Sequence, residues 1–227
     1  QEADLPLDDI PRLMAEGVTC ERSVQMQDGS IILINFQPLD QGGWVQVLRD
    51  VTRQCRSDEQ IRYLAEHDSL TGLANRIVFN IMLAHELEHL AAGAACTVFC
   101  IDLDHFKCVN DTLGHPVGDE LLRMVAERLR RTVGKVGTIA RLGGDEFAIL
   151  FGASINAVEA DALAAEIIET VERPYEIDGH NIVIGASIGI AGAPDDGSCA
   201  ETLMRNADIA LYRAKSGGRG IVQRFAP

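Results

Sequence analysis

One pair of acidic residues closes an apolar run and could bind a metal ion. Asp102 and Asp104 stand at the end of Cys96–Leu103, a run of strand length. Side chains two positions apart on a strand share a face, so both carboxylates would point the same way. Such oxygen ligands suit Mg²⁺, which binds through one or two carboxylates plus substrate phosphates. The alternative is a solvated strand end in which Asp104 caps the next helix.

A second acidic pair follows two glycines. Asp145 and Glu146 come directly after Gly143-Gly144 and open another apolar run. Glycine allows positive φ and a close approach of ligand to main chain. A hairpin that placed these acids beside Asp102 would complete a magnesium site, where two ions could activate a hydroxyl and neutralise a leaving pyrophosphate. The alternative is an ordinary Gly-Gly-Asp turn.

Further polar residues could bind a nucleotide. Lys107 closely follows the strand end and could contact phosphate. Asn110 offers a donor and an acceptor, and Asp119 accepts from paired N–H donors such as those of guanine. Helix capping is the alternative for both. Lys215 and Arg219 at the end of the last helix could bind phosphate, or could only complement the helix C-terminus.

The elements that must position these residues alternate between strand and helix. Strands are expected at 96–103, 138–142 and 146–151, in the β-rich run 181–191 and at 221–225. Apolar residues recur at helical spacing in 79–90, 122–129, 160–171 and 203–214. Because a glycine hairpin interrupts the alternation, we expect an α+β fold, close to the ferredoxin-like plan, in which helices flank a mixed central sheet.

The N-terminal part has a different pattern. Runs at 19–25, 30–37 and 44–49 are separated by turn signals, one of them Gln41-Gly42-Gly43, and predict a short antiparallel β segment. Residues 53–66 are polar, lack Gly and Pro, and predict a linker helix. Residues 1–16 show little pattern.

Composition limits the classes of function. The 227-residue chain carries a net charge of −14, which argues against nucleic-acid binding because that requires clustered Lys and Arg. Its six cysteines form no CxxC pair, so we expect a reducing, cytoplasmic compartment. No apolar run approaches the roughly 20 residues of a membrane span.

Three ordered motifs together resemble the GGDEF family of diguanylate cyclases. They are His67–Arg76, Gly143–Phe147 and Ala207–Lys215, and the resemblance runs from about residue 63 to 225. It implies a fold like the palm of nucleotide cyclases and polymerases, over residues 67–227. Several motifs at matching spacing are far more specific than any one alone.

The resemblance also implies metal ligands and a catalytic acid pair. Asp102 and Asp145 would bind Mg²⁺ by their side chains, and Leu103 would bind it by its carbonyl oxygen. Glu146 would assist the reacting 3′-hydroxyl or the second metal. Two Mg²⁺ ions are expected in each half-site, with Mn²⁺ as an alternative ion.

Substrate contacts are implied in the same way. Asn110 and Asp119 would read guanine, the helix that begins at Phe106 would offer backbone N–H groups to phosphate, and Arg141 would orient the site. The residues implied in holding the triphosphate are Lys107, Lys215 and Arg219.

The implied reaction joins two GTP molecules into cyclic di-GMP across a homodimer in which each domain holds one GTP. Two other functions stay open. One is a non-catalytic GTP-binding module that regulates an EAL phosphodiesterase domain absent from this chain. The other is a dimerisation piece built on the N-terminal segment.

Two resemblances concern regulation and neighbouring domains. Residues 1–52, through Asp28-Gly29-Ser30, Trp44 and Asp50-Val51-Thr52, resemble the last strands of a PAS sensory domain. The tail 222–227 resembles the exit of GGDEF domains that precede an EAL domain.

Many GGDEF domains also carry an RxxD site for product inhibition, but in this chain the corresponding residues are Gly134-Lys135-Val136-Gly137. We therefore expect no tight product binding at that surface.

Overall fold

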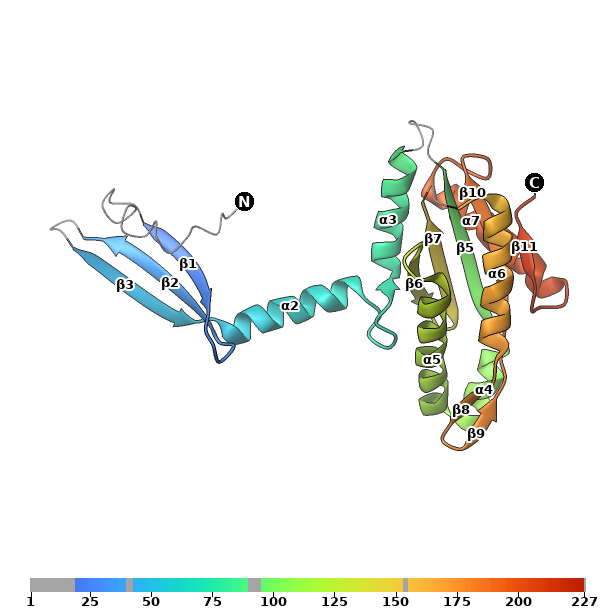
Figure 1. The fold of residues 1–227 in the computed structure, drawn as a ribbon, viewed down its shortest axis with the longest axis horizontal. Coiled ribbons are helices and arrows are strands. Elements are labelled where there is room, and N and C mark those ends of the chain that lie inside the picture. The colour runs from blue at the N-terminus through green and yellow to red at the C-terminus, as the bar shows by residue number, and fades with distance from the viewer. Residues whose placement is uncertain (1–18, 40–42, 90–94, 153–154, 227) are drawn as a thin grey trace. The chain divides into compact units, whose positions relative to one another are not determined.

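The computed structural model describes residues 19–39, 43–89, 95–152 and 155–226. The chain divides between Tyr63 and Leu64 into two compact units (Figure 1). The expected turn at Gln41-Gly42 and the helical position Leu90 lie outside the described residues. No helix in the described ranges combines the length and apolarity that a membrane crossing requires.

The first unit contains an antiparallel sheet with the order β1-β2-β3. Its strands are β1 (Cys20–Gln25), β2 (Ile31–Pro38) and β3 (Trp44–Asp50), which confirms the expected β segment. The side chain of Thr52 ends the sheet and begins the next helix, because its Oγ1 donates to Asp50 and accepts from the N–H of Ile31. That helix, α2 (Thr52–Glu66), has no buried residue and matches the expected linker.

The described part of the second unit forms a six-stranded sheet with the order β11-β10-β5-β7-β6-β4. The central strand β5 (Cys96–Asp104) pairs antiparallel with β10 (Gly185–Ala193) and with β7 (Glu146–Phe151). Toward the edges, β10 pairs parallel with β11 (Val222–Arg224), and β6 (Thr138–Gly143) pairs parallel with β4 (Ala74–Asn75). The expected mixed sheet is therefore confirmed.

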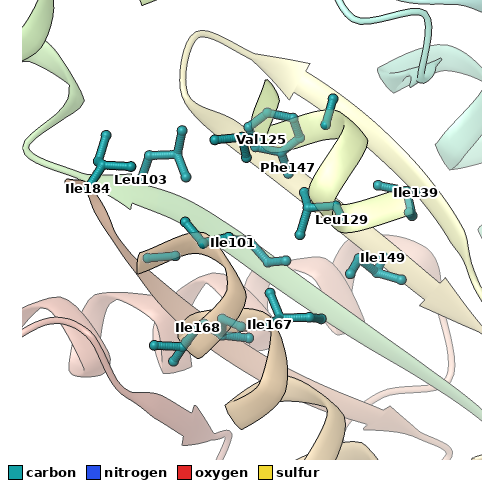
Figure 2. Close-up of a cluster of buried hydrophobic side chains, with 14 of the residues drawn as sticks. Ile101, Leu103, Val125, Leu129, Ile139, Phe147, Ile149, Ile167, Ile168 and Ile184 are labelled. Atoms are coloured by element: carbon teal, nitrogen blue, oxygen red, sulfur yellow. The ribbon is translucent and has the colours of Figure 1, made fainter. Parts of the chain in front are cut away.

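Helices cover both faces of this sheet (Figure 1). Helices α5 (His115–Val133) and α6 (Ala157–Glu172) pack on one face, and α3 (Arg76–Glu88) and α7 (Ala200–Ser216) pack on the other. Alternate residues of β5 enter the two apolar clusters, as the two-residue period of a strand requires. Figure 2 shows the α5 and α6 side, with labelled residues that include Ile101, Leu103, Val125, Phe147 and Ile167.

The β-rich run that we expected at 181–191 splits into two strands. β9 (His180–Ile182) pairs with β8 (Tyr175–Ile177), and β10 begins only at Gly185. The pair β8-β9 closes at Asp178-Gly179, which have φ of 50° and 78°. Asp-Gly favours this kind of two-residue hairpin turn, so the sequence contains a signal for it.

Candidate active site

The acidic end of β5 lies beside the C-terminal end of α7. Asp102 and Asp104 are both buried, with 9% and 5% of their surface exposed. The Nζ of Lys215 lies 2.7 Å from Oδ2 of Asp102, and the Nε of Arg219 lies 3.9 Å from Oδ1 of Asp104. Two ion pairs therefore link the end of β5 to the end of α7 and the residues that follow it.

The glycine hairpin between β6 and β7 meets the same strand end. The antiparallel register puts Glu146 opposite Asp102, and the N–H of Leu103 donates to the carbonyl oxygen of Asp145 over 3.3 Å. Gly144 has φ of 54°, a conformation that favours glycine. The hairpin thus brings its acidic residues beside Asp102, which is the juxtaposition that a shared metal site requires.

Arg141 fixes the shape of this hairpin. Its Nη2 and Nε donate to the carbonyl oxygen of Gly144 over 2.7 and 3.0 Å, and its Nη1 lies 3.0 Å from Oδ1 of Asp68. The N–H and hydroxyl of Thr71 also donate to Asp68. Sequence reasoning assigned no role to Asp68. The signal that could have found it is the Asp-x-x-Thr spacing, in which an acid accepts from nearby backbone and hydroxyl donors.

Asp68 carries an altered pKa. Burial raises the pKa of its carboxyl, but the hydrogen bonds from Thr71 and Arg141 outweigh burial and hold the pKa below its ordinary value. The charged form of Asp68 is therefore the form that the folded chain stabilises.

An open pocket of about 290 Å³ lies where the strand end, the hairpin and the helix end meet. Both carboxylates proposed as metal ligands and the three cationic side chains proposed to bind phosphate line it. The lining residues are Asp102, Leu103, Asp104, His105, Phe106, Lys107, Cys108, Asp145, Lys215 and Arg219. Opposite charges therefore share one cavity, as a metal–triphosphate site needs.

The environment of Asp102 favours its protonated form more than water does. Burial raises the pKa of its carboxyl, Lys215 opposes that rise by hydrogen bonding and charge, and the nearby charge of Asp145 adds to it. The net effect is a pKa above the ordinary value. A cation placed near both carboxylates would reverse this effect because it stabilises their charged forms.

Asp104 does not cap the helix that follows it. The N-cap of α4 (Phe106–Leu113) is His105, which makes no side-chain cap hydrogen bond. Asp104 instead accepts from the hydroxyl of Ser187 over 2.9 Å and from the N–H of Gly220 over 3.0 Å. The capping interpretation of Asp104 is wrong because its side chain turns back across the sheet.

The two residues proposed to read guanine lie on α4 and α5, outside the set that lines the pocket. Asn110 is inside α4, and Asp119 is exposed in the first turns of α5, whose N-cap is Gly114. Neither caps a helix, so the capping alternative is wrong for both. Gly118 makes room for Asn110, since a Cβ at Gly118 would lie only 1.9 Å from Oδ1 of Asn110.

A family model described as "Diguanylate cyclase, GGDEF domain" matches residues 65–220. The chain belongs to the GGDEF family. A solved GGDEF structure, a sensory box/GGDEF family protein from Caulobacter crescentus, is 46% identical, with a TM-score of 0.64 over 67% of this chain and 99% of that one. The match is therefore one of sequence and of fold.

Two curated relatives of this GGDEF chain are much longer than it. An uncharacterised signalling protein of Caulobacter vibrioides is 42% identical over 98% of this chain and 26% of its own length. MucR of Pseudomonas aeruginosa, a bifunctional diguanylate cyclase/cyclic di-GMP phosphodiesterase, is 44% identical over 74% of this chain and 24% of its own length. The chain thus spans about a quarter of the length of these two relatives.

The donor atoms of this GGDEF site fit the magnesium that the family implies. Within the described ranges, no three His, Cys, Asp or Glu side chains are gathered around one point. The pocket does contain the carboxylates of Asp102 and Asp145 and the main chain of Leu103. Mg²⁺ requires few protein ligands, because waters and substrate phosphates complete its shell.

Glu146 is not among the residues that line the pocket. Its carboxylate lies 3.4 Å from Nη2 of Arg76, and 53% of its side chain is exposed. Arg76 also donates from Nε to the carbonyl oxygen of Leu142, so it contacts the hairpin from the α3 side. Sequence reasoning assigned Arg76 to the opening motif and did not connect it with Glu146.

Proposed function

We propose that this chain is a diguanylate cyclase that condenses two GTP molecules into cyclic di-GMP and two pyrophosphates. The observation that supports it best is one pocket lined by Asp102, Asp145 and the cations Lys107, Lys215 and Arg219. A similar relative, MucR, carries diguanylate cyclase activity in its name. The alternative of a scaffold alone does not account for this concentration of opposite charges in a cavity.

Each protein group has a task in this proposal. Lys107, Lys215 and Arg219 bind the triphosphate, with Arg suited to bidentate phosphate contacts. The backbone N–H groups at the start of α4 add further donors. Asn110 and Asp119 hold guanine from the α4 and α5 side. Arg141 keeps the hairpin closed so that Asp145 stays beside Asp102.

The reaction consists of two matched displacements. The 3′-oxygen of one GTP attacks the α-phosphorus of the other, a new P–O bond forms, and the α–β bridging bond breaks. Pyrophosphate leaves with the electron pair, and the hydroxyl proton passes to a base, for which Glu146 is our candidate. This role requires the Glu146 carboxylate to turn from Arg76 toward the pocket. A second displacement closes the ring. Because each chain holds one GTP, a two-fold homodimer must place the half-sites face to face.

We assign the metal to Asp102, Asp145 and the carbonyl oxygen of Leu103, with two Mg²⁺ ions in each half-site and Mn²⁺ as a substitute. The metal would neutralise phosphate charge and favour the ionised 3′-hydroxyl. The protein groups contribute position and charge, which is the main source of catalysis in reactions of this type.

The rest of the protein has proposed roles as well. We propose that the β1-β2-β3 sheet is the end of a PAS sensory domain and that α2 transmits its state. The length of the relatives and the name of MucR are consistent with an EAL phosphodiesterase domain in the full protein. We place the reaction in the cytoplasm, where GTP is available.

Activity on GTP tests the proposal directly. The purified chain is incubated with GTP and Mg²⁺ at several protein concentrations, and cyclic di-GMP is quantified by chromatography. We expect specific activity to rise with concentration as monomers pair. Asp145→Ala should lower turnover by about 100-fold or more because it deletes a metal ligand at the reacting centre. The control is Asp195→Ala, an exposed acid outside the pocket. Full activity in Asp145→Ala would contradict the assignment.

A second candidate is a non-catalytic GTP sensor that regulates an attached phosphodiesterase. One observation favours it: the carboxylate of Glu146 is engaged by Arg76 rather than directed into the pocket. GTP binding without any product at high protein concentration would select this function over the cyclase.

A further inference from the structure

Asp104 has a set of partners that separates it from the metal ligands. It is 5% exposed, and its carboxylate accepts from Ser187 Oγ and from the N–H of Gly220. Ser187 is fully buried on β10, and Gly220 belongs to the loop after α7. The carboxylate therefore ties the end of β5 to that loop.

The tied loop holds Arg219 in an uncommon conformation. Arg219 has φ of 64°, between Gly218 at 127° and Gly220 at 60°. A non-glycine residue in the left-handed region persists only where its surroundings fix it. The bond from the Gly220 N–H to Asp104 and the bond from the Arg219 N–H to the carbonyl oxygen of Ala214 fix the loop on both sides.

The guanidinium of Arg219 remains available for a ligand. Its Nε is 3.9 Å from Asp104, beyond a normal hydrogen bond, and 49% of its side chain is exposed at the pocket. The negative charge of Asp104 thus attracts the guanidinium without consuming its donors. Lys215 differs, because it contacts Asp102 directly at 2.7 Å.

We propose that Asp104 is a positioning residue that holds Arg219 at the triphosphate site and binds no metal itself. The proposal rests on the proposed function, since it assumes that a nucleotide triphosphate occupies this pocket. Its consequence is that Asp104 affects the binding of GTP through Arg219, and affects turnover of bound GTP much less.

A double-mutant cycle tests this link. Asp104→Asn, Arg219→Ala and the double variant are compared in the full chain, with KM and kcat measured for GTP. Kd is measured by calorimetry for an analogue whose α,β-bridging oxygen is CH₂ and which therefore cannot lose pyrophosphate. Arg219→Ala should weaken binding about 10-fold or more, and Asp104→Asn about 3- to 10-fold, as the loss of a charge-assisted contact predicts. The double variant should bind no more weakly than Arg219→Ala.

The variant Ser187→Ala distinguishes a specific effect of Asp104 on Arg219 from a general loss of stability around this carboxylate. It removes one buried hydrogen bond from the same carboxylate but leaves the charge beside Arg219. We expect lower thermal stability with a Kd within about twofold of the original chain. If Asp104→Asn does not fold, Asp104→Ser replaces it, because Ser keeps an acceptor in less volume.

Three outcomes would overturn the inference. The first is an unchanged Kd in a folded Asp104 variant. The second is a double variant whose loss of affinity equals the product of the two single losses. The third is a loss of affinity in Ser187→Ala as large as that in Asp104→Asn. If the first outcome, an unchanged Kd, is accompanied by a loss of kcat, it indicates a metal-ligand role for Asp104. If the original chain does not bind the analogue, both this inference and the proposed function fail. If the original chain binds it and the Asp104 variants bind equally well, this inference fails and the proposed function is retained.

Discussion

The Nζ of Lys215 lies 2.7 Å from Oδ2 of Asp102. We assign the same carboxylate to the metal. An ammonium and a divalent ion repel each other, so they compete for this oxygen. The triphosphate of GTP offers Lys215 another anionic partner. Nucleotide binding should therefore release Asp102 for the metal, which makes the binding of GTP and metal cooperative.

Replacing Lys215 with Met should change two affinities in opposite directions. The KM for GTP should rise about 10-fold because a charge-assisted phosphate contact is lost. The affinity for Mn²⁺ without nucleotide should increase, because the competing cation is gone. Calorimetric Mn²⁺ titration of both proteins measures the second effect. Equal Mn²⁺ affinity in the two proteins would show that Lys215 and the metal do not compete.

Selection of guanine should depend on the corner between α4 and α5. Asn110→Ala should reduce the preference for GTP over ATP by about 10-fold or more, because partners of the base are left unpaired. Gly118→Ala should produce a similar loss, since its Cβ would lie 1.9 Å from Oδ1 of Asn110 and must displace that side chain. The ratio of kcat/KM for the two nucleotides measures both. An unchanged ratio in both variants would remove this corner from the guanine site.

Asp68 should contribute stability that depends on pH. Its folded-state pKa lies below the ordinary 3.8, so its contribution is complete above that value and is lost as pH falls through the lower folded pKa. Asp68→Asn should cost about 1 to 3 kcal/mol at neutral pH, and this difference from the original chain should shrink below about pH 4. Urea unfolding at several pH values measures the difference, and Asp195→Asn is the exposed control. A difference that is constant down to pH 3 would contradict the linkage.

The product-inhibition site should be absent and hard to restore. Gly134 has φ of 60°, and a Cβ at Gly137 would lie 2.7 Å from the ring of Phe151. Gly137→Asp should lower the free energy of unfolding by about 1 to 3 kcal/mol through overpacking. The double variant Gly134→Arg/Gly137→Asp should still bind no cyclic di-GMP tightly. Calorimetry on nucleotide-free protein measures the binding of cyclic di-GMP. Micromolar binding by the original chain would contradict the expectation that the product-inhibition site is absent.

Local patterns were sufficient for most elements of the fold. Apolar spacing identified the strand at 96–103, and Gly143-Gly144 identified the hairpin, because side-chain period and glycine conformations are properties of short segments. The same reasoning merged β9 with β10, because the two residues between them, Val183 and Ile184, are apolar and β-branched and give no turn signal. It also assigned possible capping roles to Asp104, Asn110 and Asp119, because capping residues and ligand residues are of the same types.

The sequence by itself determined which side chains are available: the acids at 102 and 145, the cations at 107, 215 and 219, and the glycines between the strands. Only the tertiary structure decided their partners. Strand register placed Glu146 opposite Asp102, and helix packing brought Lys215 to Asp102. The pairing of β5 with β10 brought Ser187 to Asp104, and the loop after α7 brought Gly220 to it. Such contacts join residues far apart in the chain, and they depend on how whole elements pack rather than on any local pattern of residues.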